Sequence, residues 1–125
     1  MNPYLEEVIA LHDMIEALFA RGEGSVAGML KRFHPDFAMV TPAGMQLGLG
    51  EVSTLFAQRG GSQPGLCIEL TEQQVLAQWP EGAVVSYRET HHVPGQPAKA
   101  RISTVLFSLQ AGQVLWRHLH ETGAA

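Results

Sequence analysis

Two histidines lie one residue apart near the end of the chain, in the segment 116–122 (WRHLHET). Alternate residues of a β-strand share a face, so His118 and His120 could bind a metal together or act as a general acid and base. Glu89 could orient either imidazole, and Arg101 could hold a carboxylate or enolate oxygen beside them. A network of the same groups that only fixes the strand register is the alternative. The sequence predicts His118, His120 and Glu89 as candidate catalytic residues, with no metal and no cofactor.

Four segments of β-strand character fill the second half of the chain and would position these groups. Each is rich in alternating or β-branched apolar residues and is bounded by turns that contain Gly or Pro. They cover residues 66–79, 83–92, 99–110 and 113–122. Long sequential antiparallel strands need a cover on one face, so this half requires a helical layer.

The first half of the chain supplies that layer. Asn2 can cap a helix that starts at Pro3, and apolar residues recur after it at three- and four-residue steps as far as Phe19. Ser25 can cap a short second helix. Two short strands and a third helix are expected at residues 37–40, 45–47 and 51–58. We predict a single α+β domain over residues 1–125, with helices packed on a strongly curved, mainly antiparallel sheet.

The last two strands can be aligned from their turn. If Ala111 and Gly112 form the loop, residues at equal distances before and after it lie opposite each other on the two strands. The predicted pairs are Leu109–Val114, Phe107–Trp116, Val105–His118 and Ser103–His120. One face is then aromatic at one end and rich in His, Arg and Ser at the other. Polar groups gathered inside a protein need partners, so this end predicts a pocket that holds water or a ligand.

The inward face of segment 83–92 depends on the length of the connection that follows it. A four-residue connection from Val93 turns Ser86, Arg88, Thr90 and His92 inward. A five-residue connection turns Val85, Tyr87, Glu89 and His91 inward instead. We favour the second because Val85 and Tyr87 suit a core better. The predicted ligand-binding residues are then Tyr87, Glu89, His91, Arg101, Ser103, Phe107, Trp116, His118 and His120.

Composition excludes several classes of partner. The formal net charge is −4 and the eight basic residues are scattered, so we expect no nucleic acid as a partner. Cys67 is the single cysteine, which rules out a disulfide framework. The N-terminal segment is amphipathic and acidic, unlike a signal peptide or a membrane span. We expect no membrane association and a cytoplasmic location.

The order of these elements resembles a known family. Two helices, the segment 34–37 (HPDF), a Gly-rich return strand and a long meander ending in 118–123 (HLHETG) resemble the NTF2-like (cystatin-like) α+β cone. Within it, the chain looks like the DUF4440/SnoaL-like small bacterial proteins and the association domain of calmodulin-dependent kinases. The resemblance implies a cone that encloses a pocket and a dimer formed through the outer face of the sheet. Its members range from isomerases and cyclases to non-enzymatic binding domains, so it implies the fold more strongly than the function.

The outer face of the predicted sheet carries an apolar stripe that is unusual on a monomer. We expect a homodimer through this face, formed by Ile102, Thr104, Leu106, Leu115, Arg117 and Leu119. The predicted function is binding of a small organic molecule in the cone. One alternative is a cofactor-independent SnoaL-like isomerase or cyclase that uses His and Glu as acid and base. Another is a non-catalytic assembly module whose cone is filled by side chains.

Overall fold

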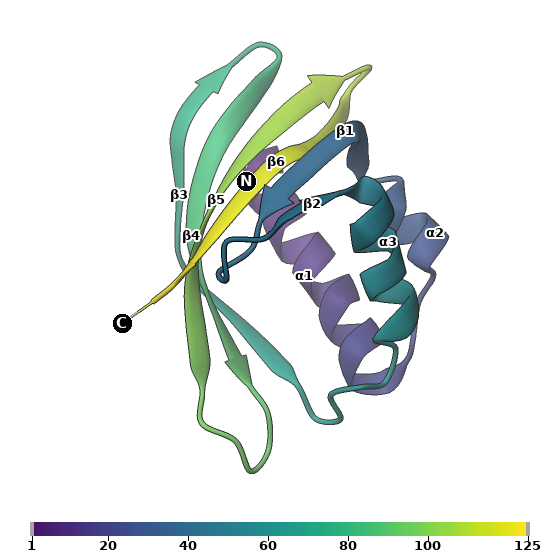
Figure 1. The fold of residues 1–125 in the computed structure, drawn as a ribbon. Helices are drawn as coiled ribbons and strands as arrows, with labels where there is room; N and C mark the ends of the chain where they lie inside the picture. Colours follow the sequence, from purple (N-terminus) through teal and green to yellow (C-terminus); the bar gives the residue numbers. More distant parts are fainter. Residues whose placement is uncertain (1, 125) are drawn as a thin grey trace.

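The chain folds into two layers, a helical one and a curved sheet (Figure 1). The computed structural model describes residues 2–124. The helices α1 (Pro3–Arg21), α2 (Val26–Leu30) and α3 (Leu49–Gln58) lie on one face of the sheet (Figure 1). The strands follow the order β2-β1-β6-β5-β4-β3, and all pairs are antiparallel except β1 with β6. Their bounds are β1 Phe33–Val40, β2 Gln46–Gly48, β3 Cys67–Trp79, β4 Gly82–His92, β5 Lys99–Gln110 and β6 Gln113–Gly123. The α+β fold class is confirmed.

Helix α1 begins after the predicted cap, Asn2, and ends at Gly22, as the sequence indicated. The Asn2 side chain accepts hydrogen bonds from the backbone N–H groups of Tyr4 and Leu5. Gly22 ends the helix with φ +67°, a conformation that glycine adopts without a Cβ clash. The buried face of the helix consists of Tyr4, Val8, Leu11, His12 and Leu18. This face packs on the sheet and places the His12 imidazole in the interior.

Strand β1 begins earlier than predicted, at Phe33 instead of residue 37. The segment pairs in parallel with β6, so that Phe33 lies opposite Trp116 and Ala38 opposite His118. The register shifts between Phe33 and Ala38, which accommodates Pro35 in the strand. Pairing with a distant parallel strand therefore decides this boundary, and a local pattern cannot show it.

The register of β4 against β5 is the one that the five-residue connection implies, although six residues separate the two strands. Val85 lies opposite Val105, and Tyr87 lies opposite Ser103. Val85 and Tyr87 are buried, as the preference for this register required.

The pairing of β5 with β6 agrees with the prediction only near the turn. Phe107 lies opposite Trp116, as expected, but a β-bulge then adds Arg117 to β6 without a partner, so that Leu106 lies opposite His118. An extra residue in one strand turns every later side chain to the other face. The predicted pairs Val105–His118 and Ser103–His120 are therefore wrong, and the observed ones are Val105–Leu119 and Ser103–Glu121.

The bulge also changes the outer face of the sheet. Leu119, predicted to lie there, is buried on the inner face and lines the interior cavity. Leu115 is 8% exposed and is not part of a free surface. Ile102 is 43% exposed and Thr104 is exposed, so this part of the predicted stripe does face solvent. Among the helices of residues 2–124, none is long and apolar enough to cross a membrane.

Candidate functional site

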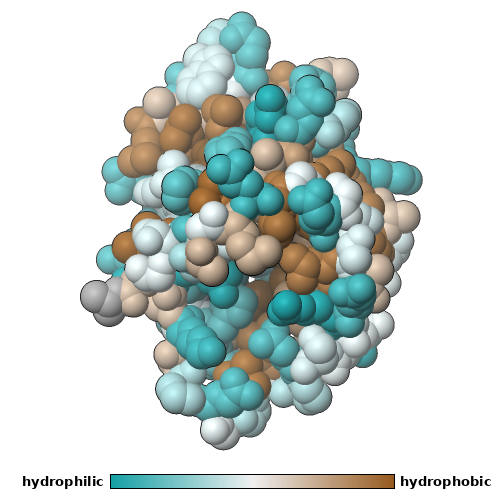
Figure 2. Space-filling model, viewed as in Figure 1, coloured by the Kyte–Doolittle hydropathy of each residue, from teal (hydrophilic) through white to brown (hydrophobic). Residues whose placement is uncertain are grey.

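A cavity of about 340 Å³ lies between the helical layer and the inner face of the sheet. This volume is within the range of pockets that bind small molecules. Much of the lining is aromatic and comes from β1, α3 and β6, namely Phe33, Phe37, Phe56 and Trp116. In the space-filling view, hydrophobic atoms appear inside a hollow ringed by hydrophilic side chains (Figure 2). The apolar lining would hold an apolar group without specific orientation.

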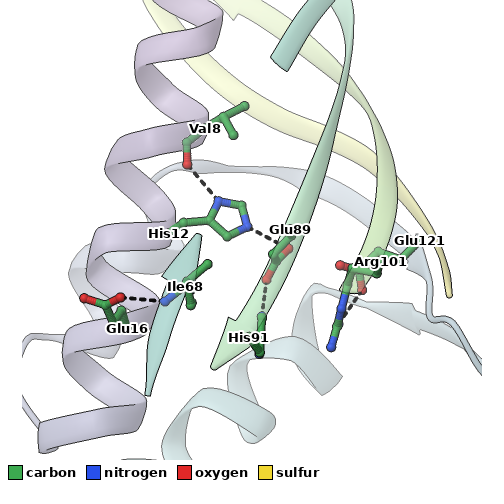
Figure 3. A network of polar contacts seen from close by, with 8 residues as sticks. All are labelled: Val8, His12, Glu16, Ile68, Glu89, His91, Arg101 and Glu121. Atoms are coloured by element: carbon green, nitrogen blue, oxygen red, sulfur yellow. Dashed lines mark hydrogen bonds and ion pairs between the residues drawn. The ribbon is translucent and has the colours of Figure 1, made fainter. Parts of the chain in front are cut away.

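Ionisable side chains gather at one end of the cavity. The neighbouring positions Tyr87, Ser103 and Glu121 form one row across β4, β5 and β6, and Glu89 lies opposite Arg101 in the next row. Helix α1 adds His12 from the opposite side (Figure 3). The polar lining at this end consists of His12, Tyr87, Glu89, His91, Arg101 and Glu121.

The Glu89 carboxylate is held between two imidazoles. Its Oε1 lies 3.1 Å from His12 Nε2, and its Oε2 lies 2.5 Å from His91 Nε2 (Figure 3). His12 Nδ1 lies 2.7 Å from the Val8 carbonyl oxygen. A carbonyl and an ionised carboxylate only accept hydrogen bonds, so both nitrogens of His12 must donate. His12 is therefore an imidazolium, and it forms a buried ion pair with Glu89.

The two pKa values move in the directions that this pair requires. Burial alone would lower the pKa of His12, but the hydrogen bond and the charge of Glu89 outweigh it, and the pKa is raised. Burial would raise the pKa of Glu89, but hydrogen bonds from His12 and His91 and their charges bring it well below the usual range. Glu89 is therefore ionised at neutral pH and has both oxygens occupied.

Glu121 is the second carboxyl group of the cavity, and its environment is different. Its pKa is raised, chiefly by burial and further by the negative charge of Glu89, against the opposing effect of Arg101. Among the described residues, its Oε1 lies 3.4 Å from Arg101 Nη1, which is long for a charge-assisted hydrogen bond. Glu121 therefore takes up a proton at a higher pH than an ordinary glutamate does, whereas Glu89 stays ionised.

Two hydroxyl groups near Glu121 lack partners. Within residues 2–124, neither the buried Tyr87 hydroxyl nor the buried Ser103 hydroxyl has a hydrogen bond of good geometry, and the weak contact that Ser103 makes with Tyr87 lowers the pKa of the phenol only slightly against the effect of burial. Burial also raises the pKa of Tyr87 well above its ordinary value, so the phenol stays neutral. A buried donor without a partner costs free energy. Because Tyr87 lines the cavity, a ligand atom could satisfy its hydroxyl.

The structure brings together five of the nine predicted ligand-binding residues. The cavity is lined by Tyr87, Glu89, His91, Arg101 and Trp116. Phe107 and Ser103 are buried in the packed core behind them, where the Phe107 ring lies against Trp116. His118 and His120 do not belong to the site, because the bulge turns both to the outer face of the sheet.

Sequence reasoning missed two residues of the polar end. His12 stands in the apolar stripe of α1, and an imidazole on a face that packs against the sheet is a usable signal for an interior polar contact. Glu121 faces inward only because of the bulge at Arg117. No Gly or Pro marks that bulge in the segment 116–122, so the sequence carries no comparable signal for Glu121.

No metal-binding arrangement is found in the part of the chain that the structure describes. There, no group of three or more His, Cys, Asp or Glu side chains is placed to hold a metal ion. The Glu89 oxygens that could serve as ligands are already occupied by His12 and His91. The arrangement is instead suited to hydrogen bonding and proton transfer.

The buried ion pair predicts how stability depends on pH. The lowered pKa of Glu89 contributes stability that is present above the ordinary glutamate pKa of 4.5 and is lost as the pH falls. The raised pKa of His12 contributes stability that is present below the ordinary histidine pKa of 6.5 and is lost as the pH rises through the raised value. Between these pH values, H12Q should lower the free energy of unfolding by about 3 kcal/mol, since it leaves a buried carboxylate without its ion-pair partner. Urea unfolding measures this.

The control is H92Q, which removes an exposed pair with Glu69. It should change the free energy of unfolding by less than about 1 kcal/mol. The loss in H12Q should shrink at alkaline pH, where His12 is neutral in the native protein. A loss in H12Q that is the same at every pH would contradict the ion pair.

Comparisons with solved structures agree with the cone architecture. An NTF-2 like protein of unknown function from Pseudomonas aeruginosa is 34% identical, with 98% of each chain covered and a TM-score of 0.92. The CamKII hub homology domain of Chlamydomonas reinhardtii is 18% identical over 98% of this chain and 96% of that one, with a TM-score of 0.78. The association domain of C. elegans CaMKII is 12% identical over 95% and 94% of the two chains, with a TM-score of 0.75.

The last two likenesses concern the fold alone, whereas the first is close enough in sequence to show kinship. No family model and no curated protein matches the sequence, so the narrower DUF4440/SnoaL-like resemblance stays a prediction. The identity of 34% extends over nearly the full length of both chains. On that ground the chain belongs to the NTF2-like family.

Proposed function

We propose that this NTF2-like chain binds a small organic molecule in the cavity. The observation that carries the proposal is the combination of an apolar cavity of about 340 Å³ with polar groups that lack adequate partners at one end. The Tyr87 hydroxyl is buried without a hydrogen bond of good geometry to the described residues, and Glu121 has one long contact with Arg101. A ligand with an apolar body and a polar head would complement both features. An assembly module with a filled cone would have neither.

A second candidate function is proton transfer on a bound carbonyl or aromatic substrate. It is favoured by the opposite pKa shifts of the two cavity carboxyls, lowered for Glu89 and raised for Glu121. Titratable groups whose pKa values are pushed apart are the usual basis of acid and base roles. In this candidate Glu121 and His91 replace His118 and His120, which face away from the cavity.

Ligand-observed NMR of a fragment library in D₂O tests both candidates. The cavity can be filled from α3 by L55W, because Leu55 is half-buried and lines the cavity. Fragments with an apolar ring and one polar head should bind the native protein and not L55W. The matched control is T54W, which adds the same indole at an exposed neighbouring position and should keep the binding.

The outcomes separate the candidates. Fragments that bind and keep all of their carbon-bound hydrogens would support binding alone. Fragments whose carbon-bound hydrogen is exchanged for deuterium by the native protein would support proton transfer. Circular dichroism must show that L55W is folded. A library in which every hit binds L55W as well as the native protein would refute the cavity as the binding site.

We propose further that the chain forms a homodimer through the outer face of the sheet. The helices leave that face uncovered (Figure 1), and it carries Ile102, Thr104 and Leu106. Ile102 is 43% exposed, which is high for a large apolar side chain. Leu115 and Leu119 are buried within the chain and no longer belong to the proposed interface.

Sedimentation velocity tests the dimer. The native protein should sediment as a dimer at micromolar concentration, and I102E should shift it toward monomer because a buried unpaired carboxylate is costly. The control is L76E, which places the same charge at an exposed leucine of the edge strand β3, which β4 separates from β5 and its Ile102. A native protein that sediments as a monomer would contradict the proposal.

A further inference from the structure

We propose that the ligand is an organic anion with an apolar body, and that Glu121 is a built-in counter-ion that releases Arg101 to the ligand when it takes up a proton. The inference rests on the proposed function of the cavity, and it adds the class of the ligand and the control of its binding. It is carried by the charges of the cavity lining and by the geometry of Arg101.

Positive charge prevails in the cavity although the whole chain has a formal net charge of −4. The lining contains Arg59 and Arg101 together with His12, which is an imidazolium. The negatively charged side chains of the lining are Glu89 and Glu121. The charges of His12 and Glu89 compensate each other, so Arg59 and Arg101 remain against Glu121. A cavity with this balance attracts an anion, and its low-dielectric walls strengthen the attraction.

Arg101 is the cation placed to bind the anion directly. Its side chain is 30% exposed and contacts Glu121 through one nitrogen, Nη1, over 3.4 Å (Figure 3). Guanidinium groups bind carboxylate and sulfonate-like oxygens best through two parallel hydrogen bonds, so one long contact leaves most of this capacity unused. An anionic head could therefore replace Glu121 at Arg101 without any change of the backbone.

Protonation of Glu121 would shift this competition. When Glu121 is ionised, it pairs with Arg101 and repels an anion; when it is protonated, it can donate a hydrogen bond instead. Burial raises the pKa of Glu121, so this change occurs at a higher pH than it would for an exposed glutamate. Anion binding should therefore strengthen as the pH falls, and binding should be accompanied by uptake of a proton.

The other ionisable groups around Glu121 must be counted as well. Arg101 faces it from β5, and Tyr87, Glu89 and His91 from β4. Helix α1 contributes His12, and the end of α3 contributes Arg59 at the cavity wall. The β1 side chains that reach the cavity are apolar, namely Phe33, Phe37 and Met39. Because several charged groups surround Glu121, the test must separate its contribution from theirs.

Two fluorescent probes of similar shape provide the test. 8-Anilinonaphthalene-1-sulfonate is an anion at every pH used, and N-phenyl-1-naphthylamine is its neutral counterpart. Both are titrated into the native chain between about pH 4.5 and pH 8, a range that begins near the ordinary glutamate pKa and extends well above it. Only fluorescence that is lost in L55W counts as cavity binding.

The native protein should bind the anionic probe about tenfold or more tightly than the neutral probe at the acidic end, the size expected for a charged hydrogen bond. R101Q should bring the ratio of the two dissociation constants close to one. E121Q should bind the anion at the alkaline end as tightly as the native protein does at the acidic end. R21Q removes the same charge at an exposed helix end and should leave the ratio unchanged.

Each contrary result has a distinct meaning. Equal affinity for both probes, or a preference that survives R101Q, would overturn the inference and leave the binding function intact. A pH dependence that persists in full in E121Q would overturn the role of Glu121. Failure of both probes to bind in the cavity would count against the proposed function itself.

Discussion

The helical layer is joined to the sheet inside the cavity by an ion pair, His12 on α1 with Glu89 on β4. Both partners are almost fully buried, so water does little to screen them. The Val8 carbonyl and the carboxylate together fix the ring orientation and the protonation state of His12. Glu89 in turn holds His91 at the cavity wall. Replacing one partner would leave a buried charge, so the pair constrains the position of α1 and with it the shape of the cavity.

The same pair divides the roles of two chemically identical side chains. Glu89 receives two imidazoles and stays ionised, whereas Glu121 on β6 is buried beside a negative charge and has one long contact with Arg101. Their environments differ far more than their local sequences do. A cavity built in this way holds one fixed negative charge and one that can be removed by a proton. This distinction gives the site its chemistry in both of the proposed functions.

Much of the fold could be predicted from residue patterns, because its signals are local. Asn2 caps α1 as expected, Ala111 and Gly112 form the last turn, and the inward face of β4 follows from the apolar character of Val85 and Tyr87. Two features depend on distant partners and escaped prediction. The early start of β1 follows from its parallel pairing with β6. Because of the bulge at Arg117, Leu119 and Glu121 face inward in place of His118 and His120. The predicted inward-facing side chains were thus right where the strands alternate regularly and wrong beyond the one bulged residue.

The protonation states of the two cavity carboxyls are the most direct test of this account. Carbon-13 NMR of the glutamate side-chain carboxyl carbons reports each titration separately, with E89Q and E121Q to assign the two signals. The account predicts that Glu89 shows no titration between about pH 4 and pH 8, whereas Glu121 titrates above the ordinary glutamate range. Two carboxyls that titrate together near the ordinary glutamate pKa would contradict it, because neither the buried ion pair nor a releasable counter-ion would then exist.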